Sequence, residues 1–362
     1  MKRDSLVIQY CALFYSCLLT IVKILVFEYI TGGGFNKQAL PSALAAEGGL
    51  MLNALLDDLI RLNSTGLTGL DVTVMRDWRL DDSGRGFINN VIIRPEHDIT
   101  EEFARLVKQA DLVWPIAPEF ENILQNLCRI VESLGKTLLT SPATAVAVAG
   151  DKLKTYELLK RNHISTVPSR MFDGDYPPSF DKLSADGEWM VKAIDGAGCA
   201  DSYVIANSQD FEQMAARQGS YIIQPHLQGA KTSLSCLFKQ GRGWLLCANL
   251  QRFDFIGKQY RLSDVVVNHH PDRGPYRQLV DKIARALPEL WGYAGIDLIE
   301  TAEQEWVLEI NPRLTTSFVG IYEALDINIA EAVLQLVHGE PVFKPMRNRA
   351  VTIQAKQEID AN

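Results

Sequence analysis

Apolar positions in the first 140 residues alternate between two spacings. Short apolar runs predict β-strands, and these lie at 24–30, 70–75, 110–116 and 136–139. Between the runs, apolar residues recur every three or four positions, as on one side of an amphipathic helix. This second spacing predicts helices at 47–62, 101–109 and 118–134. Strands that alternate with helices in this way indicate a doubly wound parallel sheet, so we expect an α/β domain first.

The rest of the chain has a different pattern, in which most elements are strands. Two short helices are predicted first, at about 142–149 and 152–162. The predicted strands follow at 189–194, 204–206, 221–224, 233–239, 244–249, 265–268, 295–300 and 306–313. Further helices are predicted at 276–291 and 322–337. Strands that follow one another without helical crossovers pair antiparallel, so we expect an α+β region behind the α/β domain.

The hairpin at 295–313 carries polar residues at a regular spacing. Alternate side chains of a strand share a face, so Glu309, Asn311 and Arg313 point the same way. The opposite, apolar face consists of Trp306, Leu308 and Ile310, and we expect it to belong to a core. If paired residue numbers sum to about 606, Asp297 lies beside Glu309, whereas the opposite parity would bury a carboxylate in the core. Two carboxylates, an amide oxygen and an arginine suit Mg²⁺ that carries a polyphosphate.

Composition places the chain among soluble globular proteins. Its 362 residues are 47% hydrophobic and 22% charged, which allows two or three domains with good cores. A net charge of -8 without a run of basic residues argues against nucleic-acid binding and favours a small-molecule partner. The six cysteines are scattered, with no Cys-x-x-Cys pair, which fits a reducing cytoplasm. The sequence leaves the oligomeric state open, and a homo-oligomer is compatible with it.

One apolar segment does not fit this class. Residues 5–22 are uncharged and mostly apolar and follow Lys2 and Arg3, about the minimum length for a membrane span or signal-anchor. They join the predicted strand at 24–30 without a linker, and a membrane helix fused directly to a central strand is sterically awkward. We therefore hypothesise that residues 1–21 reflect an incorrect start site and that Val22 is the initiator. Membrane anchoring is the alternative.

A glycine-bearing loop and a buried lysine suggest a nucleotide site. Gly196, Ala197 and Gly198 follow the strand at 189–194, and such a loop can cover a triphosphate with its N–H groups, although a plain turn also explains it. It lacks the spacing of a Walker A loop. Lys192 lies inside the apolar strand, where an unpaired ammonium is costly. We expect it to have an anionic partner, either a phosphate or a structural carboxylate.

Three further segments are less specific. Lys152 begins a helix and is by itself more often solvated than bound to a ligand. The glycine run at 32–34 lacks the spacing of a dinucleotide site, and turn geometry is the better explanation. A hinge follows the strand at 221–224, and its backbone groups can bind an adenine edge, although an inter-strand turn explains it equally well. The hinge residues are Gln224, Pro225, His226 and Leu227.

Taken in order, these features resemble the ATP-grasp superfamily over about residues 24–345. The resemblance implies that Lys152 and Lys192 bind the phosphates of ATP, that the loop at 196–198 covers them and that the hinge holds adenine. It also implies that two Mg²⁺ or Mn²⁺ ions bind to Asp297, Glu309 and Asn311, with Arg313 and Lys192 as catalytic residues. The implied segments are an apolar extension at 1–22, a pre-ATP-grasp domain at 23–140, ATP-grasp subdomains at 141–224 and 225–345, and a tail at 346–362.

Four short motifs are similar to the tyramine-glutamate ligase family of methanofuran biosynthesis. They are Phe27-Glu28-Tyr29, the stretch 47–56, the run 116–124 and Ala149-Gly150-Asp151-Lys152. This resemblance implies an ADP-forming enzyme that joins the γ-carboxyl of glutamate to tyramine or a tyrosine-like amine through an acyl phosphate. One departure is that many ATP-grasp proteins have a glutamate for the ribose just beyond the hinge, where this chain has Ala230-Lys231-Thr232-Ser233.

The substrate residues are less clearly marked than the nucleotide residues. Candidates between the hinge and the hairpin, or just beyond it, are Arg252, Gln259, Tyr260, Thr315 and Ser317, with His269 and His270 less specific. Two other functions stay open. One is an ATP-grasp ligase for another acid and amine, such as one that makes a peptide or an amino-acid amide. The other is a catalytically silent nucleotide-binding module.

Overall fold

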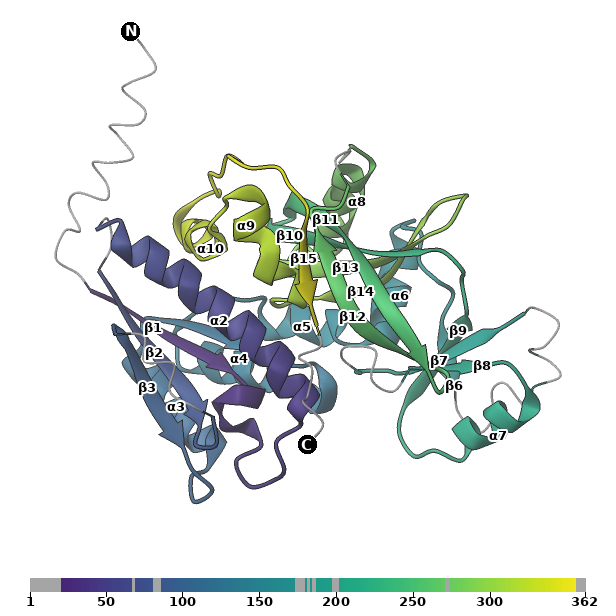
Figure 1. The fold of residues 1–362 in the computed structure, drawn as a ribbon, viewed down its shortest axis with the longest axis horizontal. Helices are drawn as coiled ribbons and strands as arrows, with labels where there is room; N and C mark the ends of the chain where they lie inside the picture. Colours follow the sequence, from purple (N-terminus) through teal and green to yellow (C-terminus); the bar gives the residue numbers. More distant parts are fainter. Residues whose placement is uncertain are drawn as a thin grey trace, which may run out of the picture.

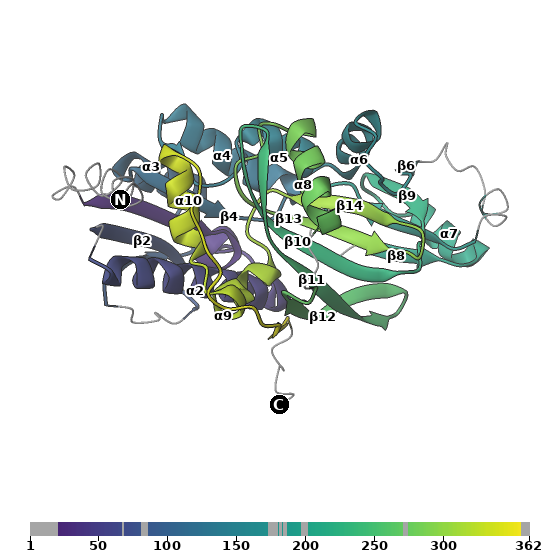
Figure 2. The same cartoon turned by 90° about the horizontal axis from the view of Figure 1, so that it is seen from above.

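The structure, a computed structural model, describes residues 21–66, 69–80, 86–172, 180, 183, 187–196, 202–270 and 274–355. Within these ranges the chain forms three β-sheets. In two perpendicular views the sheets lie in a row, with the largest sheet between the other two (Figures 1 and 2). The apolar run before Ile21 and the loop residues Ala197 and Gly198 lie outside the described residues, so the predictions about them stay predictions. Within the described residues, every helix is too short or too polar to span a bilayer.

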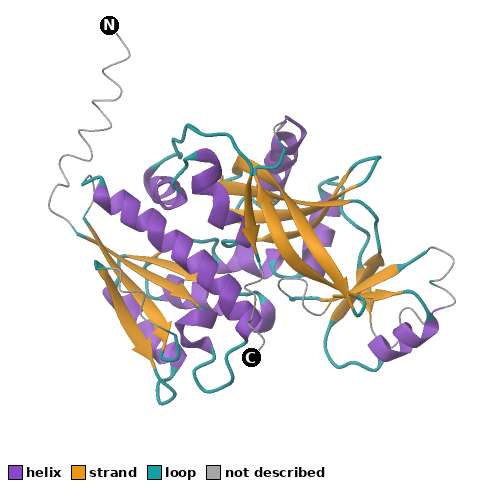
Figure 3. Ribbon diagram, in the orientation of Figure 1, coloured by secondary structure: helices purple, strands orange, loops and turns teal. Residues whose placement is uncertain are grey.

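The first sheet is parallel, as predicted from the alternating pattern. Its strands, in the order β3-β2-β1-β4-β5, are β3 (Ile88–Ile93), β2 (Leu70–Asp77), β1 (Val22–Glu28), β4 (Leu112–Ile116) and β5 (Thr137–Leu138). Helix α2 (Ser42–Ser64) packs on Ile24 and Val26 of β1. Helices α3 (Ile99–Gln109) and α4 (Ile123–Ser133) pack on Leu25 and Phe27. Because successive residues of a strand point to opposite faces, the helices cover both faces of the sheet (Figure 3).

The other two sheets are antiparallel, which confirms the predicted change of architecture. The larger sheet contains, in spatial order, β14 (Glu305–Asn311), β13 (Gly292–Glu300), β10 (Ala230–Lys239), β11 (Arg242–Ile256), β12 (Gln259–Val267) and β15 (Val351–Gln354). The smaller contains β6 (Arg170–Phe172), β9 (Tyr221–Pro225), β7 (Trp189–Ala193) and β8 (Ser202–Ile205). The remaining helices are α5 (Ala143–Ala149), α6 (Lys152–Arg161), α7 (Ser208–Ala215), α8 (Gly274–Ala286), α9 (Ile321–Leu325) and α10 (Ile329–His338).

Two predicted helices were wrong in extent because the backbone leaves the helical region. Glu121 and Asn122 have φ values of 53° and 57°, so the helix predicted from residue 118 starts at Ile123. Asp326 has φ 60° and divides the helix predicted at 322–337 into α9 and α10. Left-handed backbone at a non-glycine residue ends a helix regardless of the apolar spacing on either side.

Close packing accounts for the glycine run at 32–34. Residues Ile30–Gly34 form a short π-helical turn, and Gly33 has φ +101°, which favours glycine. A Cβ on Gly32 would lie 2.6 Å from the Phe27 ring, and one on Gly34 would lie 2.3 Å from the Tyr29 ring. The run therefore serves the backbone and the core.

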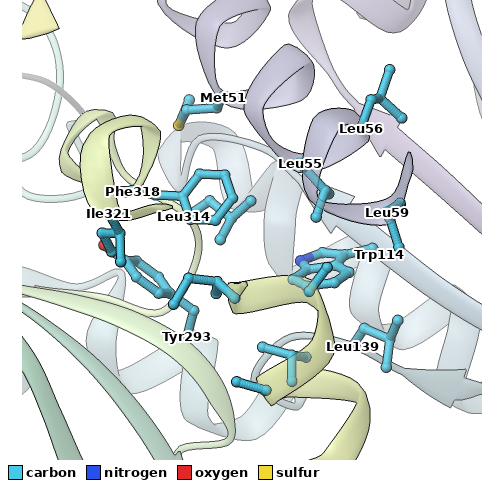
Figure 4. Close-up of a cluster of buried hydrophobic side chains, with 14 of the residues drawn as sticks. Met51, Leu55, Leu56, Leu59, Trp114, Leu139, Tyr293, Leu314, Phe318 and Ile321 are labelled. Carbon is cyan, nitrogen blue, oxygen red and sulfur yellow. The ribbon is translucent and has the colours of Figure 1, made fainter. Parts of the chain in front are cut away.

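One apolar core joins the first domain to the large antiparallel sheet. Leu55 of α2 and Trp114 of β4 belong to the same buried cluster as Tyr293 of β13 and Phe318 (Figure 4). Each of these four side chains is at most 2% exposed. This shared core holds the end of the β13–β14 hairpin against the C-terminal ends of β1 and β4.

Candidate functional site

The β13–β14 hairpin has the predicted register. Asp297 pairs with Glu309 and Gly295 with Asn311, so the paired numbers sum to 606. A bulge after Asp297 then pairs Leu298 with Val307. The extra residue reverses the alternation of the strand. The prediction that Leu308 belongs to the core was therefore wrong: Val307 is fully buried in its place, and Leu308 lines a cavity.

Asp297 is a partly buried carboxylate held by two amide groups. Gln251 Nε2 donates to its Oδ1 and Asn311 Nδ2 donates to its Oδ2, both at 3.0 Å. Burial, with the nearby charge of Glu309 as a second cause, raises the pKa of Asp297 to about 8. Such a site attracts a cation. A half-turn of the Asn311 amide would present its oxygen to that cation.

Two lysines from different elements converge on Glu309. Lys152 Nζ at the start of α6 lies 3.4 Å from Glu309 Oε2 and donates to the carbonyl oxygen of Gly196 at 2.5 Å. Burial opposes ionisation of Glu309, but the charges of Lys152 and Lys192 outweigh it and lower its pKa. Lys192 comes from β7 in the small sheet. The acidic hairpin and the two lysines therefore form one electrostatic unit.

Arg313 connects this unit to the first domain. Its Nε and Nη2 donate to Oε1 and Oε2 of Glu119, each at 2.9 Å, and its Nη1 donates to the carbonyl oxygen of Leu314 at 3.2 Å. Burial lowers the pKa of Arg313, but the charge of Glu119 outweighs this effect and raises it. Glu119 follows β4 and was not predicted as a site residue. The guanidinium is therefore fixed between the hairpin and the parallel sheet.

A cavity of about 140 Å³ brings most of the predicted residues together. The predicted residues that line it are Lys152, Lys192, Gly196, Gln224, Pro225, His226, Leu227, Tyr260, Asp297, Glu309, Asn311, Arg313, Thr315 and Ser317. Apolar side chains of Met190, Ile299 and Leu308 also line it. A largely apolar wall with convergent polar groups is typical of a small-molecule site.

Two predicted substrate residues lie elsewhere. Arg252 has a side chain that is 54% exposed and forms an ion pair with Asp264 at 3.2 Å. Gln259 begins β12 and, like Arg252, is absent from the cavity wall. His269 and His270 are exposed. In the long β11–β12 hairpin the neighbours Gln251 and Tyr260 line the cavity, so the alternation of side chains directs Arg252 and Gln259 away from it.

The hinge is fixed by contacts that the sequence did not reveal. His226 Nδ1 lies 2.9 Å from Glu188 Oε2, and His226 Nε2 lies 3.0 Å from the Tyr260 hydroxyl. The backbone N–H of His226 donates to the Glu188 carbonyl oxygen at 2.9 Å, so this donor is not available to a base. Tyr260 also lies under Lys231, whose Nζ is 4.1 Å from the ring centroid. Lys231 therefore lines the cavity just beyond the hinge, in the stretch where the resemblance implied a ribose-binding glutamate.

Glu47 is another site residue that the sequence did not reveal. It lies on α2 and lines the cavity, where the Thr316 hydroxyl donates to its Oε1.

Glu28 ends β1, and Glu119 follows the adjacent strand β4. Ligands of open α/β sheets bind at the carboxyl ends of the strands, so acidic residues at two neighbouring strand ends were a usable signal.

The donor set at the hairpin fits a divalent cation. Asp297 and Glu309 supply carboxylate oxygens and Asn311 an amide oxygen, the hard ligands that Mg²⁺ prefers. The described residues contain no cluster of three or more His, Cys, Asp or Glu side chains placed to hold a metal. Such a cation therefore needs further oxygens, which the phosphates of a nucleotide provide.

Family comparisons agree with this geometry. Residues 149–317 match the ATP-grasp domain, and residues 70–146 match the pre ATP-grasp 3 domain. The chain belongs to the ATP-grasp superfamily. The chain is 26% identical over 339 residues to the tyramine–L-glutamate ligase of Methanocaldococcus fervens, covering 91% of this chain and 99% of that protein. The protein of the same name from Methanocaldococcus jannaschii is 25% identical, with 93% and 96% covered.

Solved structures share the fold at lower identity. L-amino acid ligase from Bacillus licheniformis has a TM-score of 0.63 at 17% identity, covering 90% of this chain and 75% of that chain. N5-carboxyaminoimidazole synthetase from Staphylococcus aureus, in complex with ADP, has a TM-score of 0.64 at 18% identity, with 92% and 80% covered. With relatives that are named ligases, this ATP-grasp chain is an ATP-dependent ligase that forms C–N bonds.

Proposed function

We propose that this ATP-grasp ligase joins the γ-carboxyl group of L-glutamate to tyramine, as a step in the synthesis of a methanofuran-type cofactor. The names of the two relatives support the substrates, because the similarity extends over nearly the full length of both proteins. The observation that carries the reaction type is the convergence of Lys152 and Lys192 on Glu309, beside Asp297, in one cavity.

The proposed reaction has two steps. A carboxylate oxygen of glutamate attacks the γ-phosphorus of ATP, and ADP leaves, so that an acyl phosphate forms. The amine nitrogen then attacks the acyl carbon, phosphate leaves, and the reaction as a whole releases one proton. Mg²⁺ or Mn²⁺ held by Asp297, Glu309 and Asn311, with two ions expected, neutralises phosphate charge when bound.

The residues of the chain would hold and orient the reacting groups. Lys152 and Lys192 would bind phosphate oxygens of ATP. These oxygens would replace Glu309, which is the anionic partner of both lysines in the structure. Arg313 would donate from its Nη1 side to the acyl phosphate, because Glu119 occupies its other edge. Leu308, Ile299 and Met190 would contact the adenine base beside the hinge. Exclusion of water matters here because an acyl phosphate hydrolyses readily.

Two other functions would give different results in the same assay. An ATP-grasp ligase for another acid and amine would release ADP only with that pair, and a silent module would release none. The intact set of Asp297, Glu309, Asn311 and Arg313 favours an active enzyme, since a nucleotide-binding module has no need of a complete metal site.

The test is ADP release from ATP and Mg²⁺ with glutamate, with and without tyramine. We expect tyramine-dependent ADP release and a product whose mass equals that of the two substrates less one water. ADP release with a different acid or amine, and none with this pair, would contradict the substrates. No release across a broad panel of acids and amines would contradict ligase activity of this site.

A further inference from the structure

A second cavity lies beside the first and shares two of its residues. It has a volume of about 50 Å³ and lies between α2 and the ends of β1 and β4. Glu47 and Arg313 line both cavities, so the second one lies next to the proposed reaction centre. Glu28 and Gly48 also line it. None of the substrate residues expected from the sequence lies on this wall.

The second cavity carries more negative than positive charge. Glu28 and Glu47 are its two carboxylates, and Arg313 is the one cation among the described residues that line it. Arg313 is already bonded along one edge to Glu119. The charges of Glu119, Glu47 and Glu309 all act on its guanidinium, so one cation is shared among several carboxylates. A cationic group in the cavity would relieve the repulsion between Glu28 and Glu47.

Both carboxylates are held in place by their own contacts. Glu28 is 2% exposed and accepts hydrogen bonds from the N–H groups of Ile30 and Thr31 and from the Thr31 hydroxyl. Glu47 accepts from the Thr316 hydroxyl. The position of a cationic group between the two carboxylates is therefore defined before that group binds.

Gly48 lets helix α2 pack closely against the Glu28 carboxyl group. A Cβ at this position would lie 2.5 Å from Cδ of Glu28, closer than any side chain could approach. Nothing comparable holds at the neighbouring Gly49, where a Cβ would meet no atom within 4 Å. The glycine therefore lets α2, and with it Glu47, lie close to Glu28, and a larger residue at this wall position would displace the Glu28 carboxyl group.

The remaining wall is apolar and limits what the cavity can enclose. Ile30, Leu44, Met51 and Ile116 line it together with the carboxylates. A cavity of about 150 Å³ is needed to enclose a benzene ring. The second cavity therefore encloses a charged nitrogen and the carbons next to it, while a larger body stays toward its mouth.

We propose that the second cavity binds the ammonium group of the amine substrate between Glu28 and Glu47 and selects an amine without a carboxylate on the adjacent carbon. This inference rests on the proposed function. An amino acid would bring its carboxylate against Glu28 and Glu47, where the paired Arg313 cannot fully compensate. The cavity therefore favours tyramine over tyrosine, and more generally a decarboxylated amine over its parent amino acid.

The first experiment compares amines at saturating ATP, with the amine varied at saturating glutamate and glutamate varied at saturating amine. For the wild-type enzyme we expect kcat/KM for tyramine to exceed that for tyrosine at least tenfold. Glu47→Gln should raise the ratio of the tyramine KM to the glutamate KM about tenfold and reduce the discrimination against tyrosine. Asp57→Asn is the matched control, because Asp57 lies on the same helix but does not line the cavity. It should leave the ratio of the two KM values and the preference for tyramine over tyrosine unchanged. Equal use of tyramine and tyrosine, or a rise in the glutamate KM alone, would overturn the inference.

A second experiment separates this inference from the proposed function. Hydroxylamine traps an acyl phosphate as a hydroxamate and is too small to need the apolar wall. Leu44→Trp, at a partly exposed wall position, should reduce tyramine turnover at least tenfold more than hydroxamate formation. Equal losses of both activities would overturn the inference and leave the ligase reaction standing. If the wild-type enzyme forms neither product, the proposed function fails. Equilibrium dialysis then tests the binding of tyramine to the cavity without any reaction. Equal affinity of the wild-type enzyme and of Glu47→Gln for tyramine would overturn the inference.

Discussion

Arg313 and Glu119 form a two-point ion pair between the end of the β13–β14 hairpin and the end of β4, with both N–O distances at 2.9 Å. The two residues are 194 positions apart in the chain. Both side chains are at most 10% exposed, so the pair is shielded from solvent. The pair holds the guanidinium at the boundary of the two cavities, in the geometry that a carboxylate or phosphate partner requires.

Loss of Glu119 should destabilise the protein. Glu119→Gln leaves a buried guanidinium without its charged partner, which costs about 3–5 kcal/mol. We expect the free energy of unfolding in urea to fall by about this amount. The surface pair of Glu102 with Arg105 provides the control, because Glu102→Gln should change the same quantity by less than about 1 kcal/mol. Equal effects of the two substitutions would contradict the role of the buried pair.

Loss of Glu309 should stop turnover and leave the fold intact. Metal ions stabilise transition-state charge by several kcal/mol, so Glu309→Gln should lower kcat at least about 100-fold. The far-UV circular dichroism spectrum should not change, since glutamine has nearly the same shape as glutamate. Glu305→Gln, on the exposed start of the same strand, should keep wild-type kcat. Wild-type activity of Glu309→Gln would show that the hairpin does not hold the metal.

Lys152 should contribute mainly to ATP binding. A hydrogen bond to a charged group is worth about 1.5–3 kcal/mol, so Lys152→Met should raise the KM for ATP at least about tenfold. Lys154→Met is the matched control on α6, because Lys154 is 60% exposed and pairs with Asp151. The comparison is made by steady-state kinetics with ATP as the varied substrate. A similar KM for the two variants would argue against Lys152 as a phosphate ligand.

Glu28 should make stability depend on pH. Burial is the main cause that raises its pKa from 4.5 to about 7, and Glu47 on the facing helix adds to the rise. The folded state then binds a proton that the unfolded state releases between about pH 4.5 and pH 7. The free energy of unfolding should fall as pH rises through this window, by about 3 kcal/mol in order of magnitude.

Urea denaturation at pH 5 and pH 8 checks this expectation. Glu28→Gln should flatten the decrease, because glutamine does not titrate. Asp58, whose pKa burial raises to about 6, contributes a decrease of the same sign in a slightly lower range. Asp58→Asn therefore measures how much of the slope belongs to the second carboxyl. An unchanged slope in Glu28→Gln would show that Glu28 is ionised in the folded state at all these pH values.

Local spacing was enough to predict the two architectures and most of the residues that line the first cavity. Alternation along β13 and β14 placed Asp297 beside Glu309, because a one-residue slip would have buried a charge. The apolar run around Lys192 required an anionic partner, and Glu309 acts as one. These predictions rest on the cost of burying polar groups, which the neighbours in sequence already impose.

Other features depend on residues that are distant in sequence. The bulge that turns Leu308 into the cavity depends on how β13 and β14 pair. Left-handed backbone at Glu121 delays the start of α4, and at Asp326 it ends α9, although the apolar pattern is unbroken at both places. The exposure of Arg252 follows from the course of a long hairpin. Periodicity records which face of an element is apolar, and it does not record where the chain turns.

The acidic residues that meet at the boundary between the domains could be recognised only in the folded molecule. Glu28, Glu47 and Glu119 come from β1, α2 and the segment after β4, and each of them alone reads as an ordinary charged residue. Packing of the shared core around Trp114 and Phe318 brings all three beside Arg313. Short-range spacing thus encoded the polar residues of the first cavity, which we propose bind the nucleotide. Long-range packing created the second cavity, because its charge arises only when separate elements meet.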